Sequence, residues 1–191
     1  FGATCWWDGS FQCDAADCPY DPEACPDGTT FAENYFPADL VNVCVPDIFL
    51  SVANASNQAM YFFTSVGIEY NLGTFSDVDP LDWVGAFNGD VCVGARQWDI
   101  ARCSSGVCDL VVMGDENIEA TEGYCTSGDI PTFKIYDASA DTLYDAEASE
   151  QIAWSFNGLD IIDELNVSRD CNEELGGSAK IDDCGECSGG N

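Results

Sequence analysis

The stretch "SDVDPLDWVGAFNGDVCVGARQW", residues 76–98, decides the fold. It holds two short runs of apolar and β-branched residues, 82–88 and 91–98, which meet at Asn88-Gly89. Asn-Gly favours a tight turn at positive φ, and such a turn matches the twist of two paired strands. The stretch therefore predicts a β-hairpin, with acidic residues on both sides of its strands.

Other parts of the chain have the same character, with short β-branched or aromatic runs separated by Gly, Asn, Asp and Ser. These runs are residues 41–53, 58–70, 107–113, 132–138, 151–156 and 159–167. Only the last of them also fits a helix. Seven or eight short strands at this spacing predict an all-β fold, specifically an antiparallel β-sandwich.

Composition divides the chain into three parts. Residues 1–40 are rich in Cys and Asp and contain Pro and Gly that interrupt regular structure, whereas residues 41–167 contain the strand-like runs. Residues 168–191 are rich in Gly and Cys and have too little apolar mass to form a core alone. We therefore expect a β-sandwich domain between two disulfide-rich, loop-like terminal segments.

The chain has twelve cysteines and no histidine. Only Cys184 and Cys187 have Cys-x-x-Cys spacing, and no second pair matches them, so disulfides are expected rather than zinc sites. Cys103 and Cys108 are the best local pair, because a short closable loop joins them. Disulfides predict a secreted or cell-surface protein. All the cysteines are expected to be bonded: Cys5, Cys13, Cys18, Cys25, Cys44, Cys92, Cys103, Cys108, Cys125, Cys171, Cys184 and Cys187.

Charge restricts the possible partners. Thirty-five acidic residues face five basic ones, for a formal net charge of −30. Nucleic acid and anionic membranes are disfavoured because both attract basic surfaces. No run reaches the roughly 18 apolar residues of a membrane span. The chain begins at Phe1 without a leader, which suggests a mature chain or a fragment. Carboxylates without histidine favour calcium as the counterion.

Candidate calcium ligands surround the predicted hairpin. Asp77, Asp79 and Asp82 precede its first strand, while Asn88 and Asp90 lie at its turn. If the hairpin folded back beside the preceding loop, these oxygens would converge as calcium requires. The alternative is a set of solvated acidic turns, and no EF-hand pattern is present. Two further acidic groups are candidates: Asp14, Asp17 and Asp21, and Asp137, Asp141 and Asp145.

The absence of histidine excludes Ser-His-Asp triads, Cys-His dyads and histidine-ligated metal hydrolases. Two carboxylates would suffice for a glycosidase, but among 35 acids some pair has a workable separation by chance. We therefore expect a protein that is not an enzyme, with glycosidase as an alternative.

Two further features concern binding and modification. Trp6 and Trp7 would point to opposite sides of a strand, so that one of them could contact a sugar or another subunit. This makes a carbohydrate-binding module another alternative. Asn54 and Asn166 lie in Asn-x-Ser acceptor patterns for N-glycosylation.

Three segments, "DWVGAFNGDVCVGARQWD", "VCDLVVMGDE" and "GDIPTFKIYDASADTLYDA", together resemble a module of large secreted proteins from marine and Bacteroidetes-like bacteria. The resemblance covers residues 58–167. "CWWDGSFQCDAADCP" is similar to a Cys-rich segment that often precedes the module, and "DCNEELGGSAKIDDCGECSGGN" resembles one unit of a tandem repeat. No catalytic residues come with this resemblance.

The resemblance implies a multi-module extracellular surface protein with a structural or adhesive role. Cys-rich ends suit docking on a neighbour, and exposed sheet edges allow pairing between copies. We therefore expect a calcium-stabilised building block of a surface assembly or filament. Its partners would be copies of itself, with polysaccharide as a further possibility.

Overall fold

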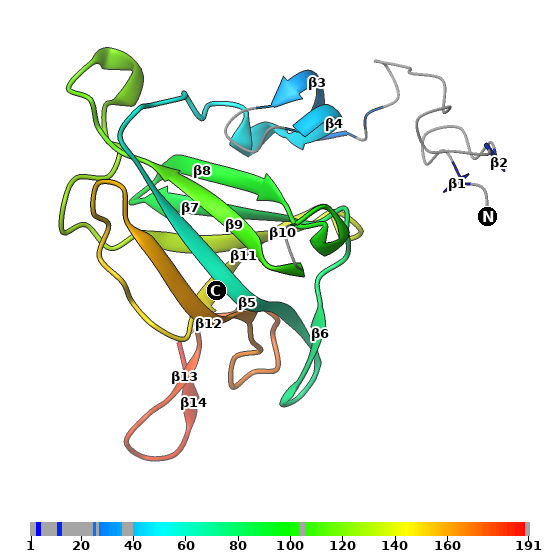
Figure 1. The fold of residues 1–191 in the computed structure, drawn as a ribbon. Helices are drawn as coiled ribbons and strands as arrows, with labels where there is room; N and C mark the ends of the chain where they lie inside the picture. Colours follow the sequence, from blue (N-terminus) through cyan, green and yellow to red (C-terminus); the bar gives the residue numbers. More distant parts are fainter. Residues whose placement is uncertain are drawn as a thin grey trace.

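The computed structural model describes residues 3–4, 11–12, 25, 27–35, 40–103 and 106–189, and it confirms an all-β fold (Figure 1). The strands are β1 (Ala3–Thr4), β2 (Phe11–Gln12), β3 (Thr29–Tyr35), β4 (Leu40–Pro46), β5 (Gln58–Asn71), β6 (Thr74–Asp77), β7 (Trp83–Asn88), β8 (Val91–Gln97), β9 (Cys108–Met113), β10 (Thr132–Asp137), β11 (Thr142–Ala148), β12 (Leu159–Val167), β13 (Lys180–Ile181) and β14 (Cys187–Ser188). Short 3-10 turns are η2 (Asp47–Phe49), η3 (Ile100–Arg102) and η5 (Glu119–Thr121). Within the described residues, no helix has the length and apolar character needed to cross a membrane.

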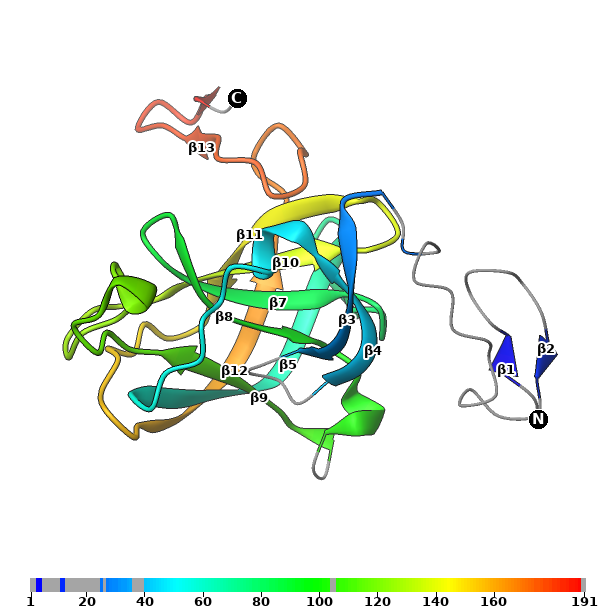
Figure 2. The same cartoon turned by 90° about the horizontal axis from the view of Figure 1, so that it is seen from above.

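Eight strands form one curled sheet in the order β6-β5-β12-β11-β10-β7-β8, with β9 also paired to β5. Strand β11 joins two layers, because its first part pairs with β10 and its last residues pair with β12. We call β5, β9 and β12 the first layer, and β7, β8 and β10 the second layer. The two layers enclose the main core in a sandwich-like arrangement (Figure 1, Figure 2).

The sheet is mixed, because β5 and β12 run parallel from the pair Met60–Leu159 to the pair Ile68–Val167. The other pairings are antiparallel, as expected. Parallel neighbours need a long connection. The segment between β5 and β12 provides it, and this segment also forms the second layer.

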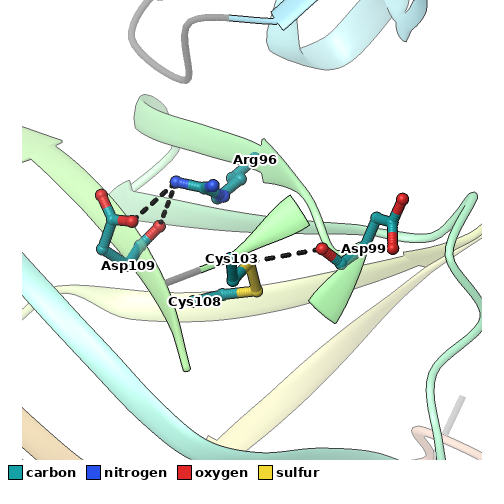
Figure 3. Close-up of polar contacts among 5 residues, drawn as sticks. All are labelled: Arg96, Asp99, Cys103, Cys108 and Asp109. Atoms are coloured by element: carbon teal, nitrogen blue, oxygen red, sulfur yellow. Dashed lines mark hydrogen bonds and ion pairs between the residues drawn. A yellow bond between two sulfur atoms is a disulfide. The ribbon is translucent and has the colours of Figure 1, made fainter. Parts of the chain in front are cut away.

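The open edges of the two layers meet where β8 crosses β9. Gly94 permits this approach, since a Cβ there would lie 2.1 Å from the Val111 carbonyl oxygen. Arg96 of β8 reaches Asp109 of β9, with 2.7 Å between Nη1 and Oδ1 (Figure 3). The disulfide Cys103–Cys108 shortens the connection between these strands. The crossing therefore closes the sandwich with an ion pair, and the disulfide tightens the loop that leads into β9.

A second core lies on the outer side of the second layer, under the β3–β4 hairpin and η2 (Figure 2). The Phe49 ring stacks on Trp83 with their centroids 6.0 Å apart, and the Tyr35 hydroxyl donates to the Phe49 carbonyl at 2.8 Å. Cys25–Cys44 fixes the hairpin covalently. The division expected at residue 40 runs through this hairpin, so residues on both sides of it belong to one packing unit.

Most predicted strands exist near their predicted bounds, and residues 159–167 form a strand rather than a helix. Residues 151–156 instead form a loop, whose Trp154 is buried and donates its Nε1–H to the Val112 carbonyl at 3.0 Å. This run is apolar because it covers the core, although it pairs with no strand. Strands β3, β6 and β11, and the two-residue strands at the ends of the chain, have no counterpart among the predicted runs.

Candidate cation-binding groove

An open groove of about 330 Å³ lies between the β5–β6 hairpin, the loop before β7, the β10–β11 turn and the start of the C-terminal segment. Five acids and one base are among its lining residues: Glu69, Asp77, Asp79, Asp82, Asp137 and Arg169. The groove therefore combines three of the predicted calcium ligands with Asp137, which the sequence analysis assigned to a different group.

Asp82 is the most buried acid of this groove, with 3% of its surface exposed. Its Oδ2 accepts the Asp79 backbone N–H at 2.8 Å, and its Oδ1 accepts the Ala138 N–H at 2.9 Å. The side chain thus joins the loop before β7 to the β10–β11 turn. This is why an acid lies directly beside a core strand: its carboxylate satisfies two buried backbone donors.

Burial raises the pKa of Asp82 above the ordinary aspartate value, although its two backbone hydrogen bonds oppose the rise. The negative charges of Asp137 and Asp79 raise the pKa further. A cation held in the groove would have the opposite effect, because it would stabilise the ionised carboxylate. The local electrostatics therefore favour a bound cation.

Three other carboxylates retain oxygens that could serve as ligands. Asp137 uses Oδ1 to accept from the Ser139 N–H, the Ser139 hydroxyl and the Ala140 N–H, at 2.7–3.0 Å. Its Oδ2, and the side chains of Asp77 and Asp79, accept no hydrogen bond from the described residues. Calcium takes six to eight oxygens and combines carboxylates with backbone carbonyls and water. These donors have the right chemistry for that ion.

The donors do not form a ready-made coordination sphere. Among the described residues, no three acidic, cysteine or histidine side chains come together closely enough to hold a metal. The exposed side chains of Asp77 and Asp79 would have to rotate toward Asp137 to share one ion with it. Such rotation is feasible for surface aspartates, whose side chains exchange rotamers within nanoseconds.

Glu69 closes one end of the groove and already has a structural role. Only 4% of it is exposed, and its two carboxylate oxygens accept the backbone N–H groups of Arg169 and Gly73. The hydrogen bond from Arg169 has the larger effect, and together with the one from Gly73 it lowers the pKa of Glu69 despite the burial of this side chain. Glu69 therefore attaches the C-terminal segment to the β5–β6 hairpin. Sequence reasoning missed it, although a lone acid within an apolar strand is a usable signal.

The predicted convergence of Asn88 and Asp90 with Asp82 is wrong. These residues lie at the far end of β7, roughly 20 Å from Asp82 at about 3.3 Å per residue. Asn88 donates from Nδ2 to the Gly123 carbonyl at 3.1 Å, and Asp90 is exposed at the hairpin turn. The hairpin extends along the sheet instead of folding back, because β7 pairs with β10 over its whole length up to Phe87.

The group of Asp137, Asp141 and Asp145 is also divided. Asp141 accepts the Tyr136 hydroxyl at 2.8 Å, and Asp145 forms an ion pair with Lys134. Only Asp137 faces the groove. Several other predicted site residues lie outside the described residues: Asp14, Asp17, Asp21, Trp6, Trp7, Cys5, Cys13 and Cys18.

The two glycosylation acceptors differ in accessibility. Asn54 is exposed in the loop after η2. Asn166 lies half-buried within β12, and its Nδ2 donates to Glu164 at 3.0 Å. Asn54 is therefore the better placed of the two for modification.

The structure has three disulfides among its described residues: Cys25–Cys44, Cys103–Cys108 and Cys171–Cys187. The predicted pairing of Cys103 with Cys108 is confirmed. The expectation that every cysteine is bonded is wrong for Cys92, Cys125 and Cys184, which are free.

The positions of Cys92 and Cys125 explain why these two free thiols have not paired with each other. Cys92 points into the second core, whereas Cys125 belongs to the main core, so they lie on different sides of the second layer. Burial raises the pKa of Cys92 to about 11 and that of Cys125 to about 12, which keeps both protonated and unreactive. Cys184 is exposed in the C-terminal segment.

The C-terminal segment contains an aspartate-capped turn at Asp170. Its Oδ1 accepts the backbone N–H groups of Asn172 at 2.8 Å and Glu174 at 3.0 Å, and its Oδ2 accepts that of Ala179 at 3.1 Å. Desolvation opposes ionisation of Asp170, but the three donors outweigh it and lower its pKa. Asp170 therefore organises the chain instead of offering a free ligand.

Twelve residues later, Asp182 forms the same kind of turn, accepting from Cys184 and Glu186 at 2.9 Å each. The fourth residue of each turn has positive φ, with 83° at Gly185 and 66° at Glu173. Glycine adopts this conformation freely, whereas glutamate does so at some cost. The segment is thus two similar turns joined by the Cys171–Cys187 disulfide.

Comparison with known proteins finds no family model, no curated protein and no solved structure that matches this chain.

Proposed function

We propose that this protein is a non-enzymatic extracellular module, structural or adhesive, that binds calcium in the acidic groove and serves as a building block of a surface assembly. The observation that carries the proposal is the meeting of Asp77, Asp79 and Asp137 in one groove beside the buried Asp82. A chain with a net charge of −30 gains most from a cation at the place where its acids are least hydrated.

The surroundings of Asp82 support a binding role over a catalytic one. In the glycosidase alternative, a general acid with raised pKa must reach the substrate oxygen. Asp82 has the raised pKa, but both its oxygens accept backbone hydrogen bonds and almost none of its surface is exposed. This geometry supports a role in holding the groove together.

Disulfides support the extracellular assignment, since such bonds persist in oxidising compartments. Cys103–Cys108 ties the loop after η3 to the buried start of β9, and Cys171–Cys187 joins two parts of the exposed C-terminal segment. The resemblance to modules of secreted bacterial surface proteins supports the same assignment and the same structural or adhesive role.

One observation favours carbohydrate binding as a second candidate. Tyr70, which lines the groove, is 55% exposed, and Phe75 on the neighbouring strand is 42% exposed. An exposed aromatic ring beside carboxylates is suited to stacking on a sugar while the acids bind its hydroxyls. A glycan array read with and without calcium would test this candidate.

The calcium proposal is tested by thermal unfolding in EDTA and in millimolar calcium. We expect calcium to stabilise the wild type by about 2.7 kcal/mol at a free concentration of a hundred times its Kd. The double variant Asp77→Asn/Asp79→Asn should lose this gain. A matched control, Asp90→Asn/Asp163→Asn, removes two exposed acids elsewhere and should keep it. Equal gains in all three proteins, or no gain in the wild type, would refute the site.

A further inference from the structure

An apolar surface covers the outer side of the first layer, and we call it the bare face. It consists of Met60, Phe62, Leu159 and Ile161 and, at its edge, Val111, which also packs against the main core. The strand register makes it continuous, because Met60 lies between Leu159 and Val111, and Phe62 lies beside Ile161. Leu159 is 70% exposed and Ile161 is 68% exposed. In Figure 1 these strands lie in front of β7 and β8, so the view is onto this face.

Alternation of side chains separates the bare face from the core. Tyr61, Phe63 and Ile162 point inward and are buried, while their neighbours along each strand point outward. Leu159 and Ile161 therefore contribute nothing to the main core. Large aliphatic side chains in consecutive outward positions form a contiguous apolar patch. Such a patch marks an interaction surface, whereas single exposed apolar residues are normal on any protein.

The protein covers the corresponding surface of its other layer. Trp83, Phe87 and Tyr136 point outward from the second layer and are buried beneath the β3–β4 hairpin. In this molecule, apolar residues that point outward from the sheet are therefore buried wherever another element of the fold packs over them. Within the described residues nothing comparable lies over Leu159 and Ile161.

The charge distribution indicates what could cover the bare face. None of its five residues is charged, in a chain with 35 acids. Asp109, beside Phe62 in the register, is neutralised by Arg96 at 2.7 Å, and the exposed Asp163, two residues after Ile161 on β12, lies at the edge of the face. Two copies of so acidic a chain repel one another at most orientations. Contact through the uncharged residues of this face reduces the number of carboxylates that are brought together.

We propose that the bare face is the surface through which two copies of this chain associate. The proposal deepens the proposed function, because it names the contact between building blocks. A flat sheet face can pack on its own copy about a two-fold axis, with the two sheets roughly 10 Å apart. Cationic partners would be drawn to the acidic surfaces instead, so a second copy suits this face best.

The size of the face sets the expected strength. Stable interfaces bury about 800 Å² on each partner, and five side chains supply much less. The contact should therefore be weak, with a Kd on the order of 100 μM, and should strengthen when many copies are arrayed together. Salt should tighten it, because screening reduces repulsion between two anionic bodies while leaving apolar packing intact.

Sedimentation velocity from 10 μM to 1 mM protein, in low and high salt, tests the proposal. We expect the wild type to dimerise in high salt and Leu159→Ser/Ile161→Ser to bind at least tenfold more weakly. The control Leu72→Ser/Ile181→Ser removes two equally exposed aliphatic side chains, 76% and 67% exposed, and should dimerise like the wild type. A wild type that stays monomeric throughout, or a bare-face variant that dimerises normally, would overturn the proposal.

Repeating the series in EDTA and in calcium separates the two proposals. Dimerisation without any calcium effect would support the bare face and leave the groove unsupported. Calcium stabilisation together with an unchanged dimer in the Leu159→Ser/Ile161→Ser variant would support the groove and refute the interface. Polysaccharide binding that requires Leu159 and Ile161 in a monomeric protein would also refute it.

Discussion

The two outer faces of the sandwich have similar sequence character but different surroundings. The second layer presents Trp83, Phe87 and Tyr136 to a disulfide-bonded hairpin, and all three are buried. The first layer presents Leu159 and Ile161 to solvent. Strand patterning determines which residues point outward, but a separate element of the chain decides whether an outward residue becomes core.

This difference gives the two faces different roles. Burial of aromatic side chains under the hairpin contributes to folding, since each such side chain is worth several kcal/mol when truncated. Exposed aliphatic residues on the bare face contribute little to folding, and they remain available for association. Substitutions on each face separate these roles.

The largest difference should come from the matched substitutions Phe49→Ala and Phe62→Ala. Phe49 is fully buried against Trp83, and a Cβ at Gly85 would lie 2.5 Å from its ring, so its loss leaves a cavity. We expect a loss of about 3–5 kcal/mol for Phe49→Ala. Phe62 is half-buried on the bare face and should cost about 1 kcal/mol or less. Urea unfolding measures both, and equal losses would contradict the distinction between the faces.

The disulfide that holds the hairpin over the covered face should have the next largest effect. Cys25→Ser/Cys44→Ser opens a bridge between residues 19 apart, whereas Cys103→Ser/Cys108→Ser opens one between residues five apart. The loop-entropy relation gives losses of about 3 and about 2 kcal/mol. The first variant should also expose Trp83, which a red shift in tryptophan fluorescence would report. An unshifted spectrum would mean that the hairpin keeps its position without the bridge.

Acid should release the C-terminal segment from the first layer before it affects the covered face. The folded-state pKa of Glu69 lies below its ordinary 4.5, so its hydrogen bonds stabilise the fold above that pH and are lost as pH falls through the lowered value. The effect of pH on stability has the opposite sign for Asp82. Its pKa is raised above 3.8, so protonation at low pH removes a buried charge.

Hydrogen exchange measured between pH 5 and pH 3 follows the effects of protonating Glu69 and Asp82. Residues 169–187 should lose protection first, while β7 should retain it. Glu69→Gln should weaken the attachment at all pH values, because one of its two acceptors becomes a donor. Simultaneous loss of protection in both regions would contradict this order.

The smallest effect is expected on the bare face of the monomer. Leu159→Ser and Ile161→Ser should each change the free energy of unfolding by about 0.5 kcal/mol or less, because little area is buried at either position. Dilute samples, at a few micromolar, keep the proposed dimer from contributing. A loss above about 2 kcal/mol would show that these residues belong to a core.

Local patterning was sufficient for much of the fold. Alternation and the Asn88-Gly89 turn predicted the β7–β8 hairpin, and β-branched runs predicted β5, β10 and β12. β11 escaped prediction because Asp145 and Glu147 alternate with small or half-buried residues, which gives little apolar signal. β4 was predicted within the run 41–53, but its partner β3 was missed because the stability of this hairpin depends on distant partners in the second layer.

The candidate groove could not be predicted without the strand pairing. Pairing of Trp83 with Tyr136 brings Asp82, just before β7, and Asp137, the last residue of β10, to one end of the sheet. Their separation of 55 positions in sequence gives no hint of this neighbourhood. The same pairing carries Asn88 away from the groove. For the cysteines, spacing alone could not show that Cys92 and Cys125 lie on different sides of a layer.

The most direct test of the account is hydrogen exchange of the wild type at several protein concentrations. Association through the bare face predicts that protection of residues 58–63 and 159–163 rises with concentration in high salt, while that of 83–88 and 91–97 stays constant. Concentration-independent exchange at 58–63 and 159–163, or a change confined to the covered face, would contradict it.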